Sequence, residues 1–432
     1  MQSIWRETAQ LPRFEPLKQD RKTDVLIIGG GIAGLLSAYM LNRAGVDCVL
    51  VESDRICGGI TKDTTAKITV QHGLIYDKLI REFGLETARL YLQANGAALD
   101  QYQSLCQTIE CDFQQRNSVV YTLDDRRSIE KELTALQKIG YPAKMISELP
   151  LPFLTAGAVC FEEQAQFHPL KFLAAIAQRC SVFENTRVLE IKQGAAVTEC
   201  GMIKAENIIV ATHFPFLNKH GSYFLKLYQH RSYVLALKNA PEVRDMVVDA
   251  SDTGLSFRSY GDTLLLGGGG HRTGKQGGGW RELEAFANRY YPGAQVTARW
   301  ATQDCMTLDG VPYIGQYSGR TQNLYVAAGF NKWGMSSAMT AAMLLADLVQ
   351  GKESPYKEVF SPSRTVLRPQ LAINAAESAI HLLTPTVPRC PHMGCALKYN
   401  KVERTWDCPC HGSRFTETGC LINNPATDDK RM

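Results

Sequence analysis

The 432-residue sequence lacks a strong excess of charge, a basic run, and an apolar segment long enough to cross a bilayer. The net charge is only +4, so we expect no nucleic-acid partner. The apolar run over 338–349 is too short for a membrane helix. Residues 1–22 are polar and contain no apolar core of a secretory signal. We therefore expect a cytoplasmic protein with no membrane span.

Cysteine is sparse over most of the chain and dense at its end. Eight cysteines are scattered singly between Cys48 and Cys305, and the other five of the 13 crowd into the last 43 residues. Scattered thiols are typical of buried residues in a reducing compartment, whereas the dense group indicates a separate module. A chain of this length fits two or three domains.

Residues 24–52 carry the pattern of a nucleotide-binding βαβ unit. The apolar run Val25–Ile28 predicts a buried parallel strand, a helical pattern follows, and a second strand ends at Glu52. Between the first strand and the helix stands G-x-G-x-x-G, formed by Gly29, Gly31 and Gly34. Such glycines permit a tight turn and let the backbone approach a pyrophosphate at the helix N-terminus. Glu52 would accept hydrogen bonds from the ribose hydroxyls, and an acid there disfavours NADP.

FAD and NAD both fit this fingerprint, and segments farther along the chain decide between them. These segments are GGITKDTTAKITVQHG (58–73), TRVLEI (186–191), IIVATHFPF (208–216), TLDGVPYIG (307–315) and the stretch 323–351. In this order and spacing they resemble the D-amino-acid-oxidase-like group of FAD-dependent oxidoreductases, to which glycine oxidase and sarcosine oxidase belong.

The resemblance implies FAD as the cofactor and an α/β fold with an α+β substrate part, in one oxidoreductase domain over residues 1–351. A Rossmann-like FAD-binding part takes about 20–75, 185–215 and 300–351. A mixed-sheet substrate part takes about 150–180 and 225–295. The residues expected to contact FAD are Gly29, Gly31, Ile32, Ala33, Gly34, Glu52, Ser53, Thr61, Thr65, Lys67, Val188, Ala211, Thr212, Asp309, Gly329, Trp333, Gly334 and Met335.

Two polar residues are candidates for catalysis. Lys332 stands before a helix whose N-terminus, by the family pattern, points at the pyrimidine end of the flavin, where reduced flavin carries negative charge. A solvated surface lysine is the alternative. His271 follows a strand in a glycine loop and could reach the pocket, although a flexible hairpin turn fits as well. A carboxylate substrate would need an arginine, and Arg231 and Arg258 lie on candidate pocket strands; a single histidine such as His213 is more often structural.

Two cysteine–histidine boxes, CPHMGC (390–395) and CPCHGS (408–413), stand near the end of the chain. Each box mixes one cysteine with one histidine, which argues against the C-x₂₋₄-C and H-x₃₋₅-H pairs of a zinc site. A framework of disulfides is uncommon in a cytoplasmic chain. The boxes resemble those of Rieske [2Fe–2S] proteins. In such a cluster one iron is held by two thiolates and the other by two imidazoles, and the expected ligands are Cys390, His392, Cys408 and His411.

The Rieske resemblance also implies a disulfide between Cys395 and Cys410. We expect a Rieske domain over 385–432, after a linker over 352–384 with one short helix near 370–383. Few strands can be recognised before the first box. We therefore expect the cluster loops to rest on a reduced base or to borrow support from the oxidoreductase domain.

As a whole, the chain resembles fusions of a D-amino-acid-oxidase-like domain with a C-terminal Rieske domain. This implies that a small amine or amino-acid donor is oxidised at FAD. The electrons would then pass singly to the cluster and, from its exposed histidine edge, to an unidentified protein or small-molecule acceptor. Two alternatives stay open: a peroxide-forming oxidase with a sensory Rieske unit, and an electron-transfer protein without a small-molecule substrate.

Overall fold

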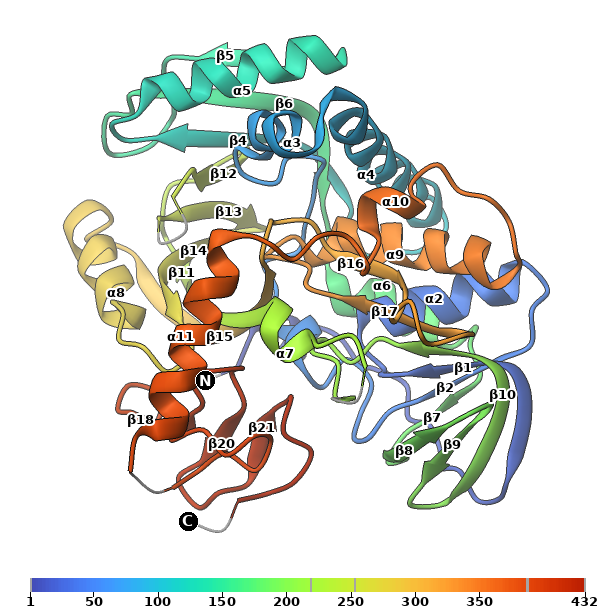
Figure 1. The fold of residues 1–432 in the computed structure, drawn as a ribbon. Helices are drawn as coiled ribbons and strands as arrows, with labels where there is room; N and C mark the ends of the chain where they lie inside the picture. The colour runs from blue at the N-terminus through green and yellow to red at the C-terminus, as the bar shows by residue number, and fades with distance from the viewer. Residues whose placement is uncertain (1, 218–219, 252–253, 386–387, 431–432) are drawn as a thin grey trace.

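Two large sheets face each other in residues 1–351, which we call the oxidoreductase part after the expectation above (Figure 1). The computed structural model describes residues 2–217, 220–251, 254–385 and 388–430. The first sheet has the strand order β16-β17-β10-β1-β2-β7, with β9 attached to β10 and β8 to β9. Its strands are β1 (Arg21–Ile28), β2 (Cys48–Val51), β7 (Val182–Phe183), β8 (Val188–Lys192), β9 (Ala195–Thr198), β10 (Gly201–Val210), β16 (Tyr313–Gln316) and β17 (Leu324–Ala328).

The centre of this sheet is parallel and buried on both faces. Strand β1 pairs in parallel with β10 and with β2, and every residue of β2 is buried. Helices α2 (Ile32–Arg43) and α9 (Gly334–Val349) pack against each other over the sheet. The apolar runs therefore predicted a Rossmann-like unit correctly. Parallel strands need apolar side chains on both faces when both are covered, here by α2 and α9 on one face and by β8 and β9 on the other.

The second sheet, called the substrate sheet below, is mixed and has the order β15-β11-β14-β13-β12-β4-β6-β3, with β5 paired to β6. It uses more of the chain than the expected segments, since its first strand comes directly after the nucleotide-binding unit. Its strands are β3 (Lys67–Ile68), β4 (Gln114–Thr122), β5 (Lys144–Ile146), β6 (Gly157–Gln166), β11 (Leu227–Lys238), β12 (Met246–Asp249), β13 (Ser256–Tyr260), β14 (Thr263–Arg272) and β15 (Gln295–Thr307). Helices α3 (Ile75–Phe83), α4 (Leu85–Cys106) and α5 (Arg126–Ile139) lie beyond β4 and β6.

Strand β11 directs alternate side chains to two different neighbours, as a strand must. Val234 belongs to the main core between the sheets. Tyr233 and Leu235 point the other way and pack with helix α8 (Gly279–Tyr290). The outer face of the substrate sheet thus packs against α8. The C-terminal unit packs on the same face, at the end of β11 that carries Gln229.

The C-terminal unit consists of the cysteine–histidine loops on a four-stranded antiparallel sheet. Its strands are β18 (Lys398–Asn400), β19 (Thr405–Asp407), β20 (Arg414–Thr416) and β21 (Leu421–Asn423). In the part of the chain that the structure describes, all four strands follow the first box. A helix, α11 (Pro369–Leu383), precedes it, close to the expected segment. The unit's own core is small and is made largely of its cysteines, with Leu397 and Phe415.

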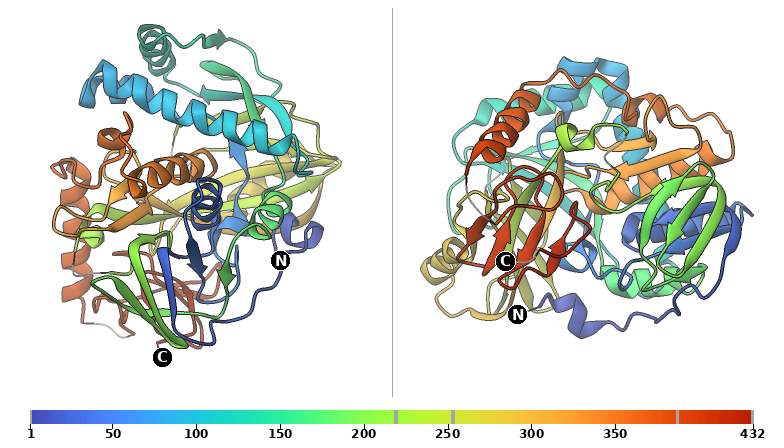
Figure 2. Two further views of the ribbon diagram at one scale, coloured as in Figure 1. Left: turned by 90° about the vertical axis from the view of Figure 1, so that its right-hand side faces the viewer. Right: turned by 60° about the horizontal axis from the view of Figure 1, so that its bottom comes forward.

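The oxidoreductase part supplies the support that this small unit needs (Figure 2). Gln229 Nε2 on β11 donates to His411 O at 3.0 Å, and Gln303 Nε2 on β15 donates to Gly412 O at 2.9 Å. A Cβ on Gly412 would lie 2.6 Å from Gln229 Cβ, so the loop and the strand are packed without spare room. Borrowed support is therefore the correct one of the two expected arrangements.

A buried ion network closes the same interface. Glu403 of the C-terminal unit pairs with Arg231 on β11 and, at 2.8 Å, with Arg414 of its own sheet. Tyr233 Oη donates to Glu403 Oε1 at 2.9 Å. The two guanidinium groups lower the pKa of Glu403 to about 2, although burial alone would raise it.

The remaining helical segments are short connectors. They are α1 (Ile4–Thr8), the 3₁₀ turn η1 (Ile60–Asp63), α6 (Pro169–Ala177), α7 (Tyr223–Lys226) and α10 (Lys357–Phe360). No helix among the described residues combines the length and the apolar character that crossing a bilayer requires.

We predict that Glu403→Gln loosens the C-terminal unit and costs about 3 kcal/mol, because it leaves a buried guanidinium without its counter-charge. The pKa of Glu403 is lower in the folded chain than the ordinary 4.5. Its stabilising contribution is therefore complete above about pH 4.5 and is lost as the pH falls toward 2. Thermal unfolding at pH 7 and at about pH 2.5 measures both effects. Glu417→Gln, an exposed site in the same unit, is the matched control, and equal losses in the two variants would contradict the prediction.

Candidate functional site

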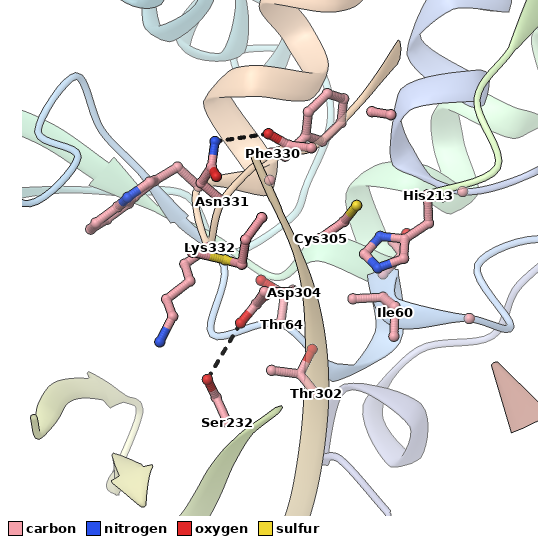
Figure 3. Close-up of a pocket in the computed structure, with 18 of the residues that line it drawn as sticks. Ile60, Thr64, His213, Ser232, Thr302, Asp304, Cys305, Phe330, Asn331 and Lys332 are labelled. Carbon is pink, nitrogen blue, oxygen red and sulfur yellow. Dashed lines mark hydrogen bonds between the residues drawn. The ribbon is translucent and has the colours of Figure 1, made fainter. Parts of the chain in front are cut away.

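A cavity of about 990 Å³ lies between the two large sheets. Its walls come from the β1–α2 loop, the segment 57–65, the inner face of the substrate sheet and the turn before α9. Figure 3 shows part of this wall, with Ser232, Thr302 and Asp304 on the sheet and Lys332 on the turn. An elongated ligand can thus touch the nucleotide loop and the substrate sheet together.

The glycine loop is built for close approach of a phosphate group. Gly29 has a φ of +111°, and a Cβ there would lie 2.6 Å from Ala211 O. A Cβ on Gly34 would collide with Gly29 O. These two positions require glycine because the strand, the loop and helix α2 meet without room for a side chain. Gly31 is the N-cap of α2, and it lines the cavity together with Ile32 and Ala33, so the helix N-terminus faces the cavity.

Two polar side chains fix this loop. The Glu52 carboxylate accepts hydrogen bonds from Gly30 N at 2.7 Å and Asp54 N at 3.0 Å. Thr61 Oγ1 accepts from Ile32 N at 3.1 Å. Glu52 also lines the cavity, where it can reach ribose hydroxyls. The loop, the acid and the open helix end together fit the adenosine diphosphate half of FAD.

Sixteen of the eighteen residues expected to contact FAD line this cavity, so one space gathers segments from Gly29 to Met335. The two others, Gly34 and Asp309, do not line the cavity but support the segments that do. Gly34 lets α2 pack on β1. Asp309 forms a buried ion pair with Arg364 at 2.7 Å and accepts from Val311 N at 3.0 Å. Asp309 thereby anchors the segment after α10 to the oxidoreductase part.

The turn before α9 places Lys332 in the cavity wall. Gly329, Asn331 and Lys332 all have positive φ. Asn331 holds the turn, because its Nδ2 donates to Gly329 O at 2.8 Å and its Oδ1 accepts from Thr307 N at 2.8 Å. Trp333 stacks on His72 with ring centroids 5.1 Å apart. The turn thus presents a lysine and the N-terminus of a 16-residue helix to the same space.

The substrate-sheet wall carries an acid that the sequence analysis missed. Asp304 on β15 lines the cavity, and Ser232 Oγ on β11 donates to its Oδ2 at 3.4 Å. Burial raises the pKa of Asp304, and Lys332 opposes that shift. The alternation of β15 could have indicated Thr302, Asp304 and Met306 as one face, but the sequence does not show that this face borders the cavity.

His271 lies away from the cavity. Its Nε2 is 3.0 Å from Tyr233 Oη, its Nδ1 is 2.9 Å from Arg272 O, and it is buried near Glu403. The described lining does not include it. The structure therefore connects His271 with the docking of the C-terminal unit.

Neither candidate arginine reaches the cavity lining among the described residues. Arg231 is occupied by Glu403. Arg258 is buried, where its Nη1 donates to Thr65 O and Ala66 O and its Nη2 to Phe167 O. Burial lowers the pKa of Arg258 to about 9, and burial beside Arg258 lowers the pKa of Lys67 on the wall to about 7.

The two boxes bring four ligand atoms of the expected kinds together. His392 Nδ1 and His411 Nδ1 are 3.3 Å apart, so both rings direct the same nitrogen to one point. The Cys390 and Cys408 thiols share a hydrogen bond, and both are buried. Gly394 and Gly412, each with positive φ, make the loop turns. Two sulfurs and two nitrogens at two loop tips fit a Rieske [2Fe–2S] cluster.

The expected disulfide is not formed. Cys395 and Cys410 are free thiols in the structure, and their Sγ atoms lie within 4.8 Å of each other and of Cys408 Sγ. A disulfide needs sulfurs about 2.05 Å apart. Here Cys395 makes thiol hydrogen bonds with Cys408 and Cys410 instead. The disulfide prediction is therefore wrong for this structure, although the two residues do adjoin the ligand pair.

The histidine edge of the cluster site faces the oxidoreductase part. The Phe214 ring centroid is 6.4 Å from those of His392 and His411, and the Phe224 centroid is 6.3 Å from that of His411. His411 is only 1% exposed, and His392 is half-buried. The expectation of an exposed histidine edge is wrong for His411, because its loop is packed on β11.

His213 links this edge with the cavity. It lines the cavity, it precedes Phe214 in the chain, and it adopts a left-handed φ of 64°. Burial lowers the pKa of His213 to about 4, so its ring is neutral at neutral pH. The sequence analysis treated it as a structural histidine, since nothing local indicated that two sites meet there.

Comparisons with known proteins agree with this geometry. A family model described as FAD dependent oxidoreductase matches residues 24–348, and a Rieske [2Fe-2S] domain model matches residues 361–431. The “Putative Rieske 2Fe-2S iron-sulfur protein YhfW” of Bacillus subtilis is 35% identical, with 98% of this chain and 96% of that protein covered. Gamma-glutamylputrescine oxidoreductase of Escherichia coli is 23% identical, with 84% and 93% covered.

Solved structures resemble the oxidoreductase part in fold. Glycine oxidase from Geobacillus kaustophilus has a TM-score of 0.67 and 21% identity, and covers 80% of this chain and 100% of its own. L-proline dehydrogenase from P. horikoshii has a TM-score of 0.67 and 18% identity, with 80% and 98% covered.

Gly34→Ala is predicted to abolish nucleotide binding, because its Cβ would force helix α2 away from Gly29. We expect purified Gly34→Ala to contain little or no flavin, measured by absorbance per protein. Gly96→Ala, on α4, meets no atom within 4 Å and should keep full flavin content. Circular dichroism of both variants separates loss of the ligand from loss of the fold, and a flavin-replete Gly34→Ala would contradict the prediction.

Removal of one cluster ligand is predicted to remove the iron and leave the flavin. Cys408→Ser should lose its acid-labile sulfide and the low-temperature electron paramagnetic resonance signal of the reduced cluster, because serine replaces one of two thiolates. Cys420→Ser changes an exposed cysteine of the same unit and should retain both. One zinc per chain in the wild-type protein, in place of two irons, would refute the ligand assignment.

Proposed function

Because the chain belongs to the FAD-dependent oxidoreductase family and carries a Rieske [2Fe–2S] domain at its C-terminal end, we propose that it is a two-centre electron relay. A small amine or amino-acid-like donor is oxidised in the cavity. Its electrons pass one at a time to the cluster and then to an external acceptor. When bound, FAD accepts two electrons from a donor as hydride, and a Rieske cluster accepts one at a time.

The observation that carries this proposal is the placement of His411. Its ring is buried against Phe214 and Phe224, and His213 beside Phe214 lines the cavity. A cluster unit with a purely sensory role would not need its histidine edge sealed against the oxidoreductase part. Electrons would have a short path from the cavity wall to that edge, through the peptide bond between His213 and Phe214 and then across the Phe214 ring to His411.

Different residues of the cavity would stabilise the reduced flavin and bind its nucleotide end. Lys332 and the N-terminus of α9 place positive potential where negative charge develops on reduction. Glu52 and the glycine loop hold the nucleotide end. Between them, Gly267, Gly268 and Gly270 of β14 line the cavity, so part of its sheet wall is backbone.

The acceptor approaches from the first box. His411 is covered, whereas His392 is half-buried and its neighbour Met393 is 37% exposed. An acceptor docked over this loop would reach the cluster through His392. We also retain the expectation of a cytoplasmic location, which rests on the scattered single cysteines of the sequence.

Reduction of the cluster by donor tests the relay. In anaerobic stopped-flow mixing with an amine or amino acid that bleaches the flavin, the cluster band should fall after the flavin band. Phe214→Leu should slow this second phase severalfold and leave the first unchanged, because it removes the ring between the two sites. Phe83→Leu, at the end of α3, is the control.

The same experiment separates the two alternatives. A flavin that bleaches beside an oxidised cluster, with unchanged peroxide formation in Cys408→Ser, would establish an oxidase with a sensory unit. Reduction of the flavin only by a reduced protein would establish an electron-transfer partner.

A further inference from the structure

The charge of the substrate-sheet wall indicates which donors the cavity accepts, an inference that rests on the proposed oxidation of a small donor. Side chains of the mixed sheet that line the cavity include Lys67, Asp249 and Asp304, and, in the described ranges, no arginine. An amino-acid substrate would bring a carboxylate, which proteins usually bind with an arginine fork. This wall offers an acid at its centre instead.

Asp304 is oriented toward the cavity by its strand. It pairs in register with His230 on β11, and Ser232 donates to its Oδ2 at 3.4 Å. In Figure 3 the carboxylate points into the space between Ser232 and Lys332. A weak hydrogen bond of this length leaves most of the acceptor capacity of the carboxylate unused.

The neighbours of Asp304 do not fully compensate its charge. Burial raises the pKa of Asp304 despite the opposing effects of Lys332, Ser232 and Arg231. Arg231 lies on the outer face and is bound to Glu403. His230 is neutral at neutral pH, because burial lowers its pKa to about 3. A further cation would therefore be stabilised at this position.

The cations of the cavity are poor anchors for a donor carboxylate. Lys67 has a pKa of about 7, lowered by burial and by Arg258, so it is only partly charged at neutral pH. The positive charge of Lys332 is partly balanced by the nearby Asp304 carboxylate, whose pKa it acts to lower. Arg55 is paired with Glu184 at 2.5 Å, and Arg187 donates to Thr427 O at 2.5 Å, both beside the nucleotide end. Lys78 on α3 also lines the cavity, where its charge acts on Asp309.

We propose that Asp304 is the specificity residue for donors that carry a second cation and no carboxylate, that is, small diamines and related polyamines. The distal ammonium binds Asp304 and Ser232. The carbon chain crosses the wall at Thr302 and Val234. The other amino group, which is to be oxidised, is directed toward the turn before α9.

Equilibrium binding to the FAD- and cluster-loaded protein, first reduced with dithionite so that the flavin cannot oxidise the probe, tests this inference without any turnover. The probes are diamines of three to five carbons, the monoamines of the same lengths, and ornithine, which is 1,4-diaminobutane with one added carboxylate. Binding is followed under anaerobic conditions by isothermal titration calorimetry and by thermal shift. The best diamine should bind at least about tenfold more tightly than its monoamine and than ornithine, since one desolvated ion pair separates them.

Asp304→Asn should remove this preference and bring the diamine to the affinity of the monoamine, without changing flavin content. Asp262→Asn, an exposed acid in the β13–β14 turn of the same sheet, is the control and should keep the preference. Lys332→Met should tighten diamine binding, because it removes a competing cation.

Two outcomes would overturn the inference. Diamines that bind no more tightly than monoamines to the wild-type protein would exclude recognition of a distal cation. Tighter binding of ornithine than of diaminobutane, lost in Lys332→Met, would show that the wall binds zwitterionic amino acids. Neither outcome depends on transfer to the cluster, so failure of the relay and failure of this inference are distinguishable.

Discussion

The packing of the second cysteine–histidine loop on strands β11 and β15 is the constraint on which the rest of the structure depends. Gln229 and Gln303 bind the backbone of that loop, and a buried Glu403–Arg231 pair closes the contact beside it. A four-stranded sheet with a core made largely of cysteines buries too little apolar surface to hold two loops rigidly by itself. The outer face of the substrate sheet therefore supplies the support that the cysteine–histidine loops need.

That arrangement gives one strand two functions. The inner side of β11 carries Ser232 and Val234 toward the cavity, and its outer side carries Gln229 and Arg231 toward the C-terminal unit. The cavity and the two cysteine–histidine loops are thus separated by little more than the sheet and the loop of His213 and Phe214. The cost is that Arg231, on a candidate pocket strand, is not available to a substrate.

The nucleotide loop and the ligand set of the cluster could be predicted from sequence because their chemistry is local. Three glycines, a strand, a helix and Glu52 lie within 30 residues, and each box supplies one cysteine and one histidine. The wall of the cavity could not be predicted, since Asp304 and Lys332 meet only through strand pairing and a turn with three positive φ angles. His271 stood in a similar glycine-rich context and lies elsewhere.

The sequence by itself determined what each part binds: the types and spacing of residues in the glycine loop and in the two boxes indicate FAD and a [2Fe–2S] cluster. Only the tertiary structure decided how the parts act on each other. It buried His411 against Phe214, left Cys395 and Cys410 as thiols, and gave the wall an acid in place of an arginine. The physical reason is that ligand chemistry follows short spacings, whereas the burial and pairing of charges are set by contacts between strands far apart in the chain.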